Sequence, residues 1–287
     1  MRRRLSTPVV MMGPAVLFTV LLVGFPFVYT IWLSFHNWFM GSRTPSRFIG
    51  FSNYVTMVHD PLFWQSLAIT LEISIAALII ELVLGTYIAL LINRSGRIVK
   101  VVRAVLLFPS VIPSVAAGMV WLVLFNPSLG FVNYVLHLVG LPSGLWLDSP
   151  HTVVGTLVFI DVWQWTPFIT LIILGGLQAL PMEPFEAAMI DGASPWQQLI
   201  HLTLPLLRPV IWVALMLRSV DVIRIFDTIY VMTQGGPGTS STSLNIYAYQ
   251  QSFQYFHMGY ASTLMLMLLI VVVVVNLGLR RFRQRGV

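Results

Sequence analysis

The sequence contains no cysteine and very little charge. Without cysteine, neither a disulfide framework nor a thiolate metal site can form, and we expect no bound metal. Only 9% of the 287 residues are charged, whereas soluble domains carry about 25%. Lysine occurs once, as Lys100, and no glycine-rich phosphate loop surrounds it. The metalloprotease HExxH and hydrolase GxSxG motifs are absent too. The chain therefore has no recognisable motif for ATP hydrolysis, zinc proteolysis or serine hydrolysis.

Hydrophobic residues make up 57% of the chain, and the mean hydropathy is +0.85. They form long runs, each of about 20 residues or more, which is enough to cross a bilayer as a helix. The sequence therefore predicts an all-α, polytopic membrane protein in which residues 1–287 form a single transmembrane domain. The expected six spans are approximately 9–35, 65–93, 99–125, 151–178, 208–232 and 259–279.

The basic residues are placed asymmetrically around these spans. Four clusters fall on one side, and only Arg43 and Arg47 occupy the loops of the other side. The positive-inside rule makes the basic side cytoplasmic, so both termini are expected inside the cell. The first run is too long for a cleavable signal, and we expect an uncleaved span. The four clusters are Arg2 to Arg4; Arg94, Arg97, Lys100 and Arg103; Arg208; and Arg280, Arg281, Arg283 and Arg285.

Prolines predict irregular helices in two of the spans. Pro14 and Pro26 favour a kink or an interruption in the first. The third span contains two Pro-Ser pairs, Pro109-Ser110 and Pro113-Ser114, whose prolines are four residues apart. Broken helices at membrane depth are tolerated where they line a cavity, so this stretch is a candidate wall of a substrate path. Small residues also allow helices to pack closely, and that interpretation stays open.

The fourth and fifth spans carry polar and charged residues at helical spacing. On the fourth, one face is expected to present Asp161, Gln164, Trp165 and Phe168. An acid, an amide and aromatic rings can hold a sugar, although a packed contact between helices explains them equally. The fifth span has charges at a strict spacing of three. Either they pair within the helix, or the first two face Asp161 across a polar cavity. These charges are Arg218, Asp221, Arg224 and Asp227.

The second span contains Glu72 and Glu81. An acid within a membrane must face protein or water. Each glutamate is therefore a candidate proton or ion site. The alternative is a buried hydrogen bond to a neighbouring helix, or, for Glu72, a position close to the interface.

The loop 179–208 predicts a helix, a glycine turn and a second helix. Residues 186–190 favour a helix, and Gly192 ends it. Ser194 and Pro195 suit the cap and the first position of a new helix. That helix is expected to be amphipathic, with Trp196, Leu199, Ile200 and Leu204 on one side, and to end at Pro205 and Pro209. Such a shape is suited to docking into a groove of a partner.

This loop resembles the EAA loop of the permease subunits of bacterial ATP-binding-cassette importers. Glu186-Ala187-Ala188, Gly192 and Leu204-Pro205 stand at the offsets of that motif, with Leu202 in place of the usual isoleucine. The resemblance covers essentially the whole chain and is strongest to the sugar, or maltose-type, branch. It implies six transmembrane helices with a cytoplasmic coupling loop. The coupling residues that it implies are Glu186, Ala187, Ala188, Asp191, Gly192, Leu204 and Pro205.

The resemblance also implies a multi-subunit machine in the bacterial cell membrane. Its other parts would be a second related six-span permease, two ATPase subunits and an extracytoplasmic solute-binding protein. ATP and magnesium would bind to the ATPase subunits, so no cofactor is expected in this chain, and nucleic acid is not an expected partner. Import would proceed by alternating access at a site near the middle of the membrane.

The residues that the resemblance places at the solute differ in type from the maltose pattern at several positions. Maltose itself is therefore not expected, and another sugar or polar solute, such as a polyol or glycerol phosphate, remains open. The implied substrate-binding residues are Ser110, Ser114, Asp161, Gln164, Trp165, Phe168, Arg218 and Asp221.

Two other classes of function compete with this one. An intramembrane enzyme could use Asp161 and Asp221 as an acid–base pair, although an EAA-like loop would have no purpose there. Ion-coupled secondary transport could instead use Glu72 or Glu81.

Overall fold

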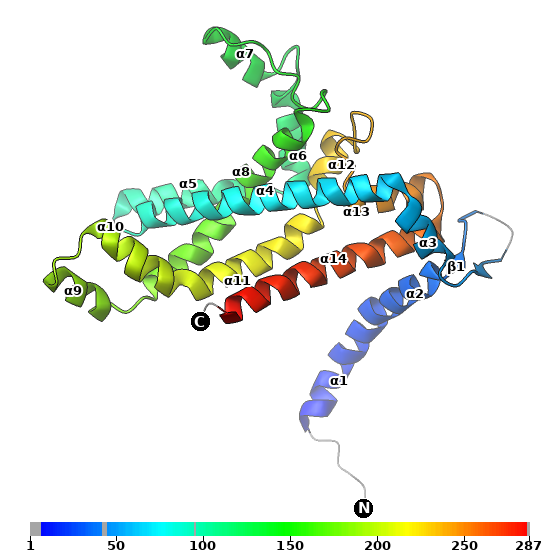
Figure 1. Cartoon of the computed structure of the whole chain (residues 1–287), viewed down its shortest axis with the longest axis horizontal. Helices are drawn as coiled ribbons and strands as arrows, with labels where there is room; N and C mark the ends of the chain where they lie inside the picture. Colours follow the sequence, from blue (N-terminus) through cyan, green and yellow to red (C-terminus); the bar gives the residue numbers. More distant parts are fainter. Residues whose placement is uncertain (1–6, 42–44, 95, 286–287) are drawn as a thin grey trace, which may run out of the picture. The chain divides into compact units, whose positions relative to one another are not determined.

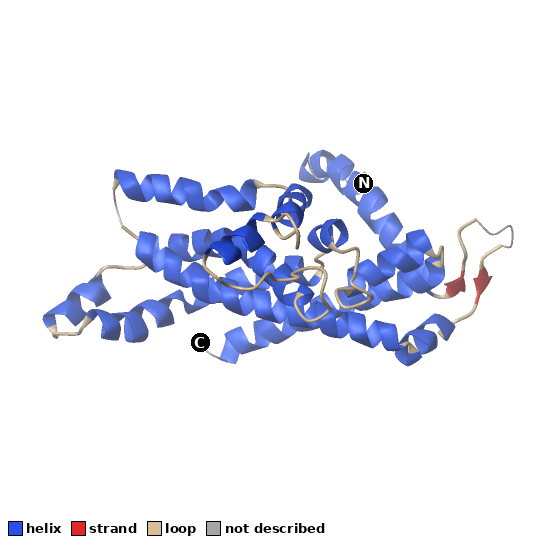
Figure 2. Ribbon diagram, turned by 90° about the horizontal axis from the view of Figure 1, so that it is seen from above, coloured by secondary structure: helices blue, strands red, loops and turns tan. Residues whose placement is uncertain are grey.

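The computed structural model describes residues 7–41, 45–94 and 96–285, and most of them are helical (Figures 1 and 2). The predicted all-α class is confirmed. Contacts divide the chain into two units, described separately: residues 1–64 with 247–269, and residues 65–246 with 270–287. The basic cluster Arg2 to Arg4 and Arg43 lie outside the described residues.

The first unit opens with a helix whose middle turn is widened. Helix α1 (Thr7–Thr19) passes through a π-helical turn, η1 (Val20–Gly24), into α2 (Phe25–Ser34). The N–H of Phe25 bonds the carbonyl of Val20, five residues back. Pro26 has no N–H, and its ring would clash with the carbonyl four residues before it, so the wider turn absorbs the proline. The predicted irregularity is therefore a π-turn, and the helix continues through it.

A short hairpin and a helix follow in this unit. Strands β1 (His36–Asn37) and β2 (Arg47–Phe48) pair antiparallel, and α3 (Ser52–His59) comes next. The amide of Asn53 donates to the carbonyls of Ser34 and His36, at 2.8 and 3.1 Å, and so ties α3 to the end of α2. The later elements that contribute to this unit are α13 (Leu244–Tyr249), η3 (Gln250–Gln254) and the first part of α14 (Met258–Arg285).

Asp60, which precedes the next long helix, joins three segments of the first unit. Its carboxylate accepts hydrogen bonds from the hydroxyls of Tyr247 and Tyr260 and from the N–H of Leu62. Burial opposes ionisation of Asp60, but these bonds outweigh it and lower its pKa. Burial and the bond to Asp60 raise the pKa of Tyr247.

The second unit is a bundle of long apolar helices with short connecting ones (Figure 1). Its core contains Ala89, Ile173 and Leu207, all 0% exposed, from three different long helices. The helices are α4 (Pro61–Ile92), α5 (Arg97–Val111), α6 (Ser114–Leu124), α7 (Phe131–Leu138), α8 (Val153–Gln178), α9 (Glu183–Ile190), α10 (Pro195–Gln198), α11 (Leu204–Ile223) and α12 (Asp227–Met232), with the π-turn η2 (Leu199–Thr203) before α11.

The third predicted span is bent at its prolines. Helices α5 and α6 meet at 94° at residues 112–113, where Pro113 adopts an extended ψ of 136°. Within the described residues, five other helices are long and apolar enough to cross a membrane. The bent pair, counted as one span, makes six. The break that the two prolines predict is confirmed, and the span expected over 99–125 consists of this bent pair.

The fifth predicted span is also interrupted. Helix α11 ends at Ile223 and α12 begins at Asp227. The carbonyls left at the break receive side-chain donors: the Asn245 amide bonds Arg224 O at 2.9 Å, and the Ser243 hydroxyl bonds Ile225 O at 3.5 Å. The span expected over 208–232 therefore contains a break that the sequence did not indicate, and Asp227 starts a new helix.

Candidate functional site

Two glycines allow the long helices of the second unit to approach closely. A Cβ at Gly85 on α4 would lie 2.7 Å from the Ile169 side chain and 3.2 Å from the backbone nitrogen of Thr170, both on α8. A Cβ at Gly176 on α8 would lie 2.8 Å from Val210 on α11. Small residues at such crossings bring backbones together in membranes. They place polar groups of α4, α8 and α11 within reach of one another.

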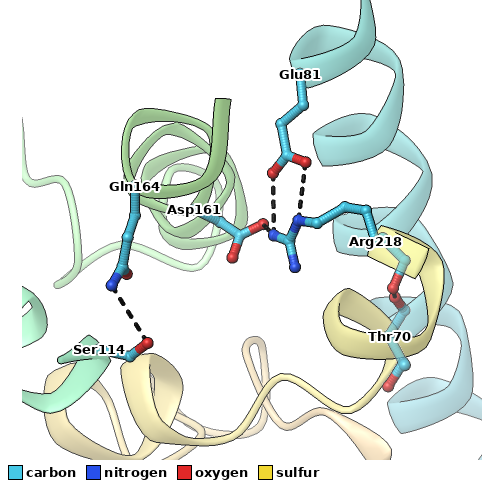
Figure 3. Close-up of polar contacts among 7 residues, drawn as sticks. Thr70, Glu81, Ser114, Asp161, Gln164 and Arg218 are labelled. Atoms are coloured by element: carbon cyan, nitrogen blue, oxygen red, sulfur yellow. Dashed lines mark hydrogen bonds and ion pairs between the residues drawn. The ribbon is translucent and has the colours of Figure 1, made fainter. Parts of the chain in front are cut away.

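Arg218 on α11 lies between two buried carboxylates, Glu81 on α4 and Asp161 on α8 (Figure 3). Its Nε and Nη2 donate to the two oxygens of Glu81 at 2.9 and 3.0 Å, and Nη2 also donates to Asp161. We call these three residues the charge triad. The exposures are 0%, 3% and 2% for Glu81, Asp161 and Arg218. The two-pronged contact with Glu81 is the stronger geometry for an arginine and a carboxylate.

Aromatic rings close the triad on one side. The guanidinium carbon of Arg218 lies 5.0 Å from the centre of the Trp165 ring, a cation–π contact. The rings of Trp165 and Phe168 lie edge to face, with their centres 6.3 Å apart. The predicted common face of Asp161, Trp165 and Phe168 is therefore real, and two of its residues contact Arg218.

Gln164, on the same face of α8, serves a different contact. Its amide donates to the carbonyl of Ile112 at 2.9 Å and to the hydroxyl of Ser114 at 3.3 Å. Ile112 lies at the bend between α5 and α6, where the helical hydrogen-bond ladder is interrupted. Gln164 thus supplies a donor that the bend requires (Figure 3). The hydroxyl of Ser110 donates within its own turn, to Leu107 O at 2.8 Å.

Asp221 is not buried with the triad, and of the two alternatives for the charges of the fifth span the one in which it faces Asp161 does not apply. Its carboxylate pairs with Arg224 at 3.1 Å, and their side chains are 51% and 55% exposed. This is the intrahelical alternative, and it applies to this pair. Arg218 is 2% exposed whereas Asp221 is exposed, so the two side chains have different surroundings although they lie one turn apart. The acid–base pairing of Asp161 with Asp221 is therefore not assembled.

The sequence left the role of Glu81 open between an ion site and a contact between helices. The structure assigns the contact, because both carboxylate oxygens are engaged by Arg218. The sequence did contain one indication of such a contact, an acid in one apolar span and a cation in another. It could not identify the pair, because the residues lie 137 positions apart. Glu72 is exposed on α4.

The loop before α11 folds as the predicted helix, glycine turn and helix. Helix α9 contains Glu186, Ala187 and Ala188, and Gly192 has a φ of +78°, the left-handed conformation that ends it. Ser194 accepts the N–H of Gln197 while the Gln197 side chain accepts the N–H of Ser194, a capping box that starts α10.

The prolines of this loop were expected to end the second helix, but they do not. Helix α10 continues through η2 into α11, which contains Pro205 in its first turn and Pro209 further in. The N–H of Leu204 bonds Leu199 O, five residues back. The π-turn stands two residues before Pro205, as η1 stands before Pro26, and it accommodates the proline in the same way.

The helix–glycine–helix segment, residues 183–203, exposes large apolar side chains. Ile190 is 87% exposed, Trp196 67% and Met189 58%, and they flank the charged and exposed Glu186 and Asp191. A cavity of about 390 Å³ opens beside the turn, lined in part by Asp191, Gly192 and His201. Exposed apolar groups concentrated on a short projecting segment mark an interaction surface.

Comparison with known proteins gives consistent relatives. A family model described as "Binding-protein-dependent transport system inner membrane component" matches residues 81–285. The trehalose/maltose transport system permease protein MalF of Thermococcus litoralis is 39% identical over 246 residues, which are 85% of this chain and 81% of that protein. The sulfoquinovosyl glycerol transport system permease protein SmoG of Agrobacterium fabrum is 35% identical over 256 residues, 89% of this chain and 83% of that protein.

Among solved structures, a chain of the bacterial alginate ABC transporter in complex with alginate pentasaccharide-bound periplasmic protein is similar in fold. The TM-score is 0.84 at 22% identity, covering 96% of this chain and 93% of that chain.

Proposed function

Because the chain belongs to the family of binding-protein-dependent transport system inner membrane components, we propose that it forms the permease of an ATP-binding-cassette importer for a sugar or sugar-like solute. It is a multi-pass membrane protein, and the match covers the charge triad as well as the helix–glycine–helix segment. The projecting segment is the observation that carries the proposal. It offers an exposed docking element between two long helices, α8 and α11, that a partner can move.

The partner at that segment is one of two ATPase subunits, which bind ATP and magnesium in place of this chain. Exposed Ile190 and Trp196 supply apolar contact, and Glu186 supplies a charge for a basic residue of the ATPase. A second related permease completes the path, and an extracytoplasmic binding protein delivers the solute. The two permeases rock against each other, and the movement alternates access to the solute.

The orientation puts both termini in the cytoplasm, together with the segment that meets the ATPases. The turn between α4 and α5 and the end of α14 carry the basic residues, as the positive-inside rule requires of cytoplasmic ends. Arg280, Arg281 and Arg283 lie in the last turns of α14.

The solute is a sugar or another polar molecule such as a polyol. Two relatives named for trehalose or maltose and for sulfoquinovosyl glycerol support this class. Trp165 and Phe168 are half-buried and offer ring faces, and Ser110, Ser114 and Gln164 offer polar groups at the bend. Asp161 and Arg218 are engaged with each other, so their proposed part is to hold this face in place. Asp221 is proposed to contribute from the exposed end of α11.

Coupling is tested in the complex reconstituted from all subunits, by measuring the stimulation of ATPase activity by solute-loaded binding protein. Gly192→Val places a β-branched residue at φ +78° and should abolish the stimulation. Gly192→Asn is the matched control, because asparagine tolerates that conformation and no atom lies within 4 Å of the added Cβ. Stimulation of Gly192→Val at the wild-type level would refute the coupling role.

The solute face is tested by uptake normalised to assembled complex. Trp165→Leu should reduce uptake strongly, and Trp163→Leu, a half-buried tryptophan elsewhere on α8, should not. Equal effects of the two changes would remove Trp165 from the solute path while leaving the coupling proposal intact.

A further inference from the structure

The turn between α4 and α5 borders a strongly basic pocket of about 350 Å³. Three of its lining residues are cationic, and two others carry amides. No carboxylate lines it in the part of the chain that the structure describes. Because the pocket lies at the ends of two membrane helices, it is at the level of the lipid head groups. Its principal lining residues are Asn93, Arg94, Val99, Lys100, Arg103 and Gln178.

Arg103 is held in this pocket by hydrogen bonds from one of its terminal nitrogens. Its Nη2 donates to the carbonyls of Ile92 and Arg94, at 2.8 and 3.3 Å, and so closes the turn between the helices. Its Nε is buried and has no hydrogen-bond partner. The held guanidinium adds its charge to those of Arg94 and Lys100, which line the pocket as well, so an anionic oxygen bound in the pocket would be stabilised by several cations.

An apolar groove runs along the same three helices that form the pocket. It has a volume of about 510 Å³ and lies between α4, α5 and α8. Leu106, which lines the groove, follows Arg103 by three residues and so lies on the same face of α5. The groove thus begins about 5 Å along α5 from the basic pocket. On α8 it is lined by Gly155 and Phe159, among others.

We propose that the basic pocket binds the phosphate of an anionic phospholipid, with an acyl chain in the adjacent groove. A cationic pocket beside an apolar groove matches the two ends of such a lipid, and basic pockets between membrane helices are known to bind acidic head groups. The bound lipid would join the α4–α5 turn to Gln178, the last residue of α8, immediately before the helix–glycine–helix segment. The site is independent of the transported solute.

Native mass spectrometry of the full chain, purified in detergent, measures retained lipid. The wild-type chain should retain at least about fivefold more dioleoyl phosphatidylglycerol than dioleoyl phosphatidylcholine. Lys100→Gln and Arg103→Gln should each lower phosphatidylglycerol retention about fivefold. Arg97→Gln is the matched control, because it removes one charge from the same helix end but does not line the pocket. If Arg103→Gln disrupts the turn between α4 and α5, the retention measured for Lys100→Gln tests the lipid site. Equal retention of both lipids, or equal effects of Lys100→Gln and Arg97→Gln, would overturn the proposal.

The source of the phosphate is decided by competition. Inorganic phosphate and glycerol 3-phosphate at millimolar concentration should leave phosphatidylglycerol bound, because they lack the acyl chains. Displacement by either at that concentration would assign the pocket to a soluble phosphate compound and overturn the lipid assignment.

The groove is tested by labelling it close to the pocket, at Leu106. A photoreactive residue at position 106 should form lipid adducts in membranes. Adducts to protein alone would show that a polypeptide covers the groove and would overturn the proposal.

Discussion

Replacing Arg218 by methionine should destabilise the protein far more than replacing any exposed arginine. Methionine keeps much of the apolar contact of the arginine stem but removes the guanidinium and its charge. Glu81 and Asp161, 0% and 3% exposed, would then lie together without a cation. Removing one partner from a buried ion pair typically costs about 3–5 kcal/mol, because an uncompensated buried charge remains.

The control is Arg224→Met, which breaks an exposed pair with Asp221. Exposed pairs contribute about 0–1 kcal/mol, so the loss should be small. SDS-driven unfolding of the purified chain, followed by tryptophan fluorescence, compares the two variants. If Arg218→Met and Arg224→Met unfold at the same SDS concentration, the reasoning about the triad is refuted.

A triple change separates the structural role of the charges from a role in transport. Glu81→Met, Asp161→Val and Arg218→Met together replace the triad by apolar side chains of roughly similar size. Apolar replacement of a complete buried ion network often has little net effect on stability, so most of the lost stability should return. If uptake in the assembled complex returns as well, the triad is an interhelical clamp. If the stable triple variant does not transport, its charges act on the solute or on the conformational change.

Three further predictions concern packing, the bend and pH. Gly85→Ala should destabilise by about 1–3 kcal/mol, because its Cβ would lie 2.7 Å from Ile169, whereas Gly175→Ala in open space should not; heat unfolding in detergent compares them. Gln164→Leu leaves the carbonyl at the α5–α6 bend without its donor and should destabilise by about 1–3 kcal/mol in the same assay, and an unchanged midpoint would exclude this role for Gln164. The pKa of Asp60 is lowered in the folded state, so its ionised carboxylate stabilises the folded protein above pH 3.8, and this contribution is lost as the pH falls below that value. Asp60→Asn should therefore be less stable than wild type at pH 6, and the difference in stability should shrink by pH 3. A difference that is independent of pH would contradict the assignment.

Local patterns in the sequence predicted the helices and the irregularities caused by proline. Apolar length identified the long helices, and Pro109 with Pro113 predicted the break in the third span. The break after Ile223 was missed, because Ser243 and Asn245, which supply its donors, follow about twenty residues later and have no local pattern. Likewise, Pro205 and Pro209 suggested a helix end, but the helix continues: the π-turn at residues 199–203 accommodates Pro205, and Pro209 lies within α11.

The sequence by itself determined the membrane class, the family and the helix–glycine–helix segment, because these depend on composition and on residues close together in the chain. It also placed Asp161, Trp165 and Phe168 on one face of a helix, since periodicity reports what a single helix presents. Only the tertiary structure decided that Arg218 pairs with Glu81 and Asp161, while Asp221 pairs outward with Arg224. Which faces meet depends on how closely the helices pack, and at Gly85 and Gly176 the missing side chains permit the approach that brings the charges together.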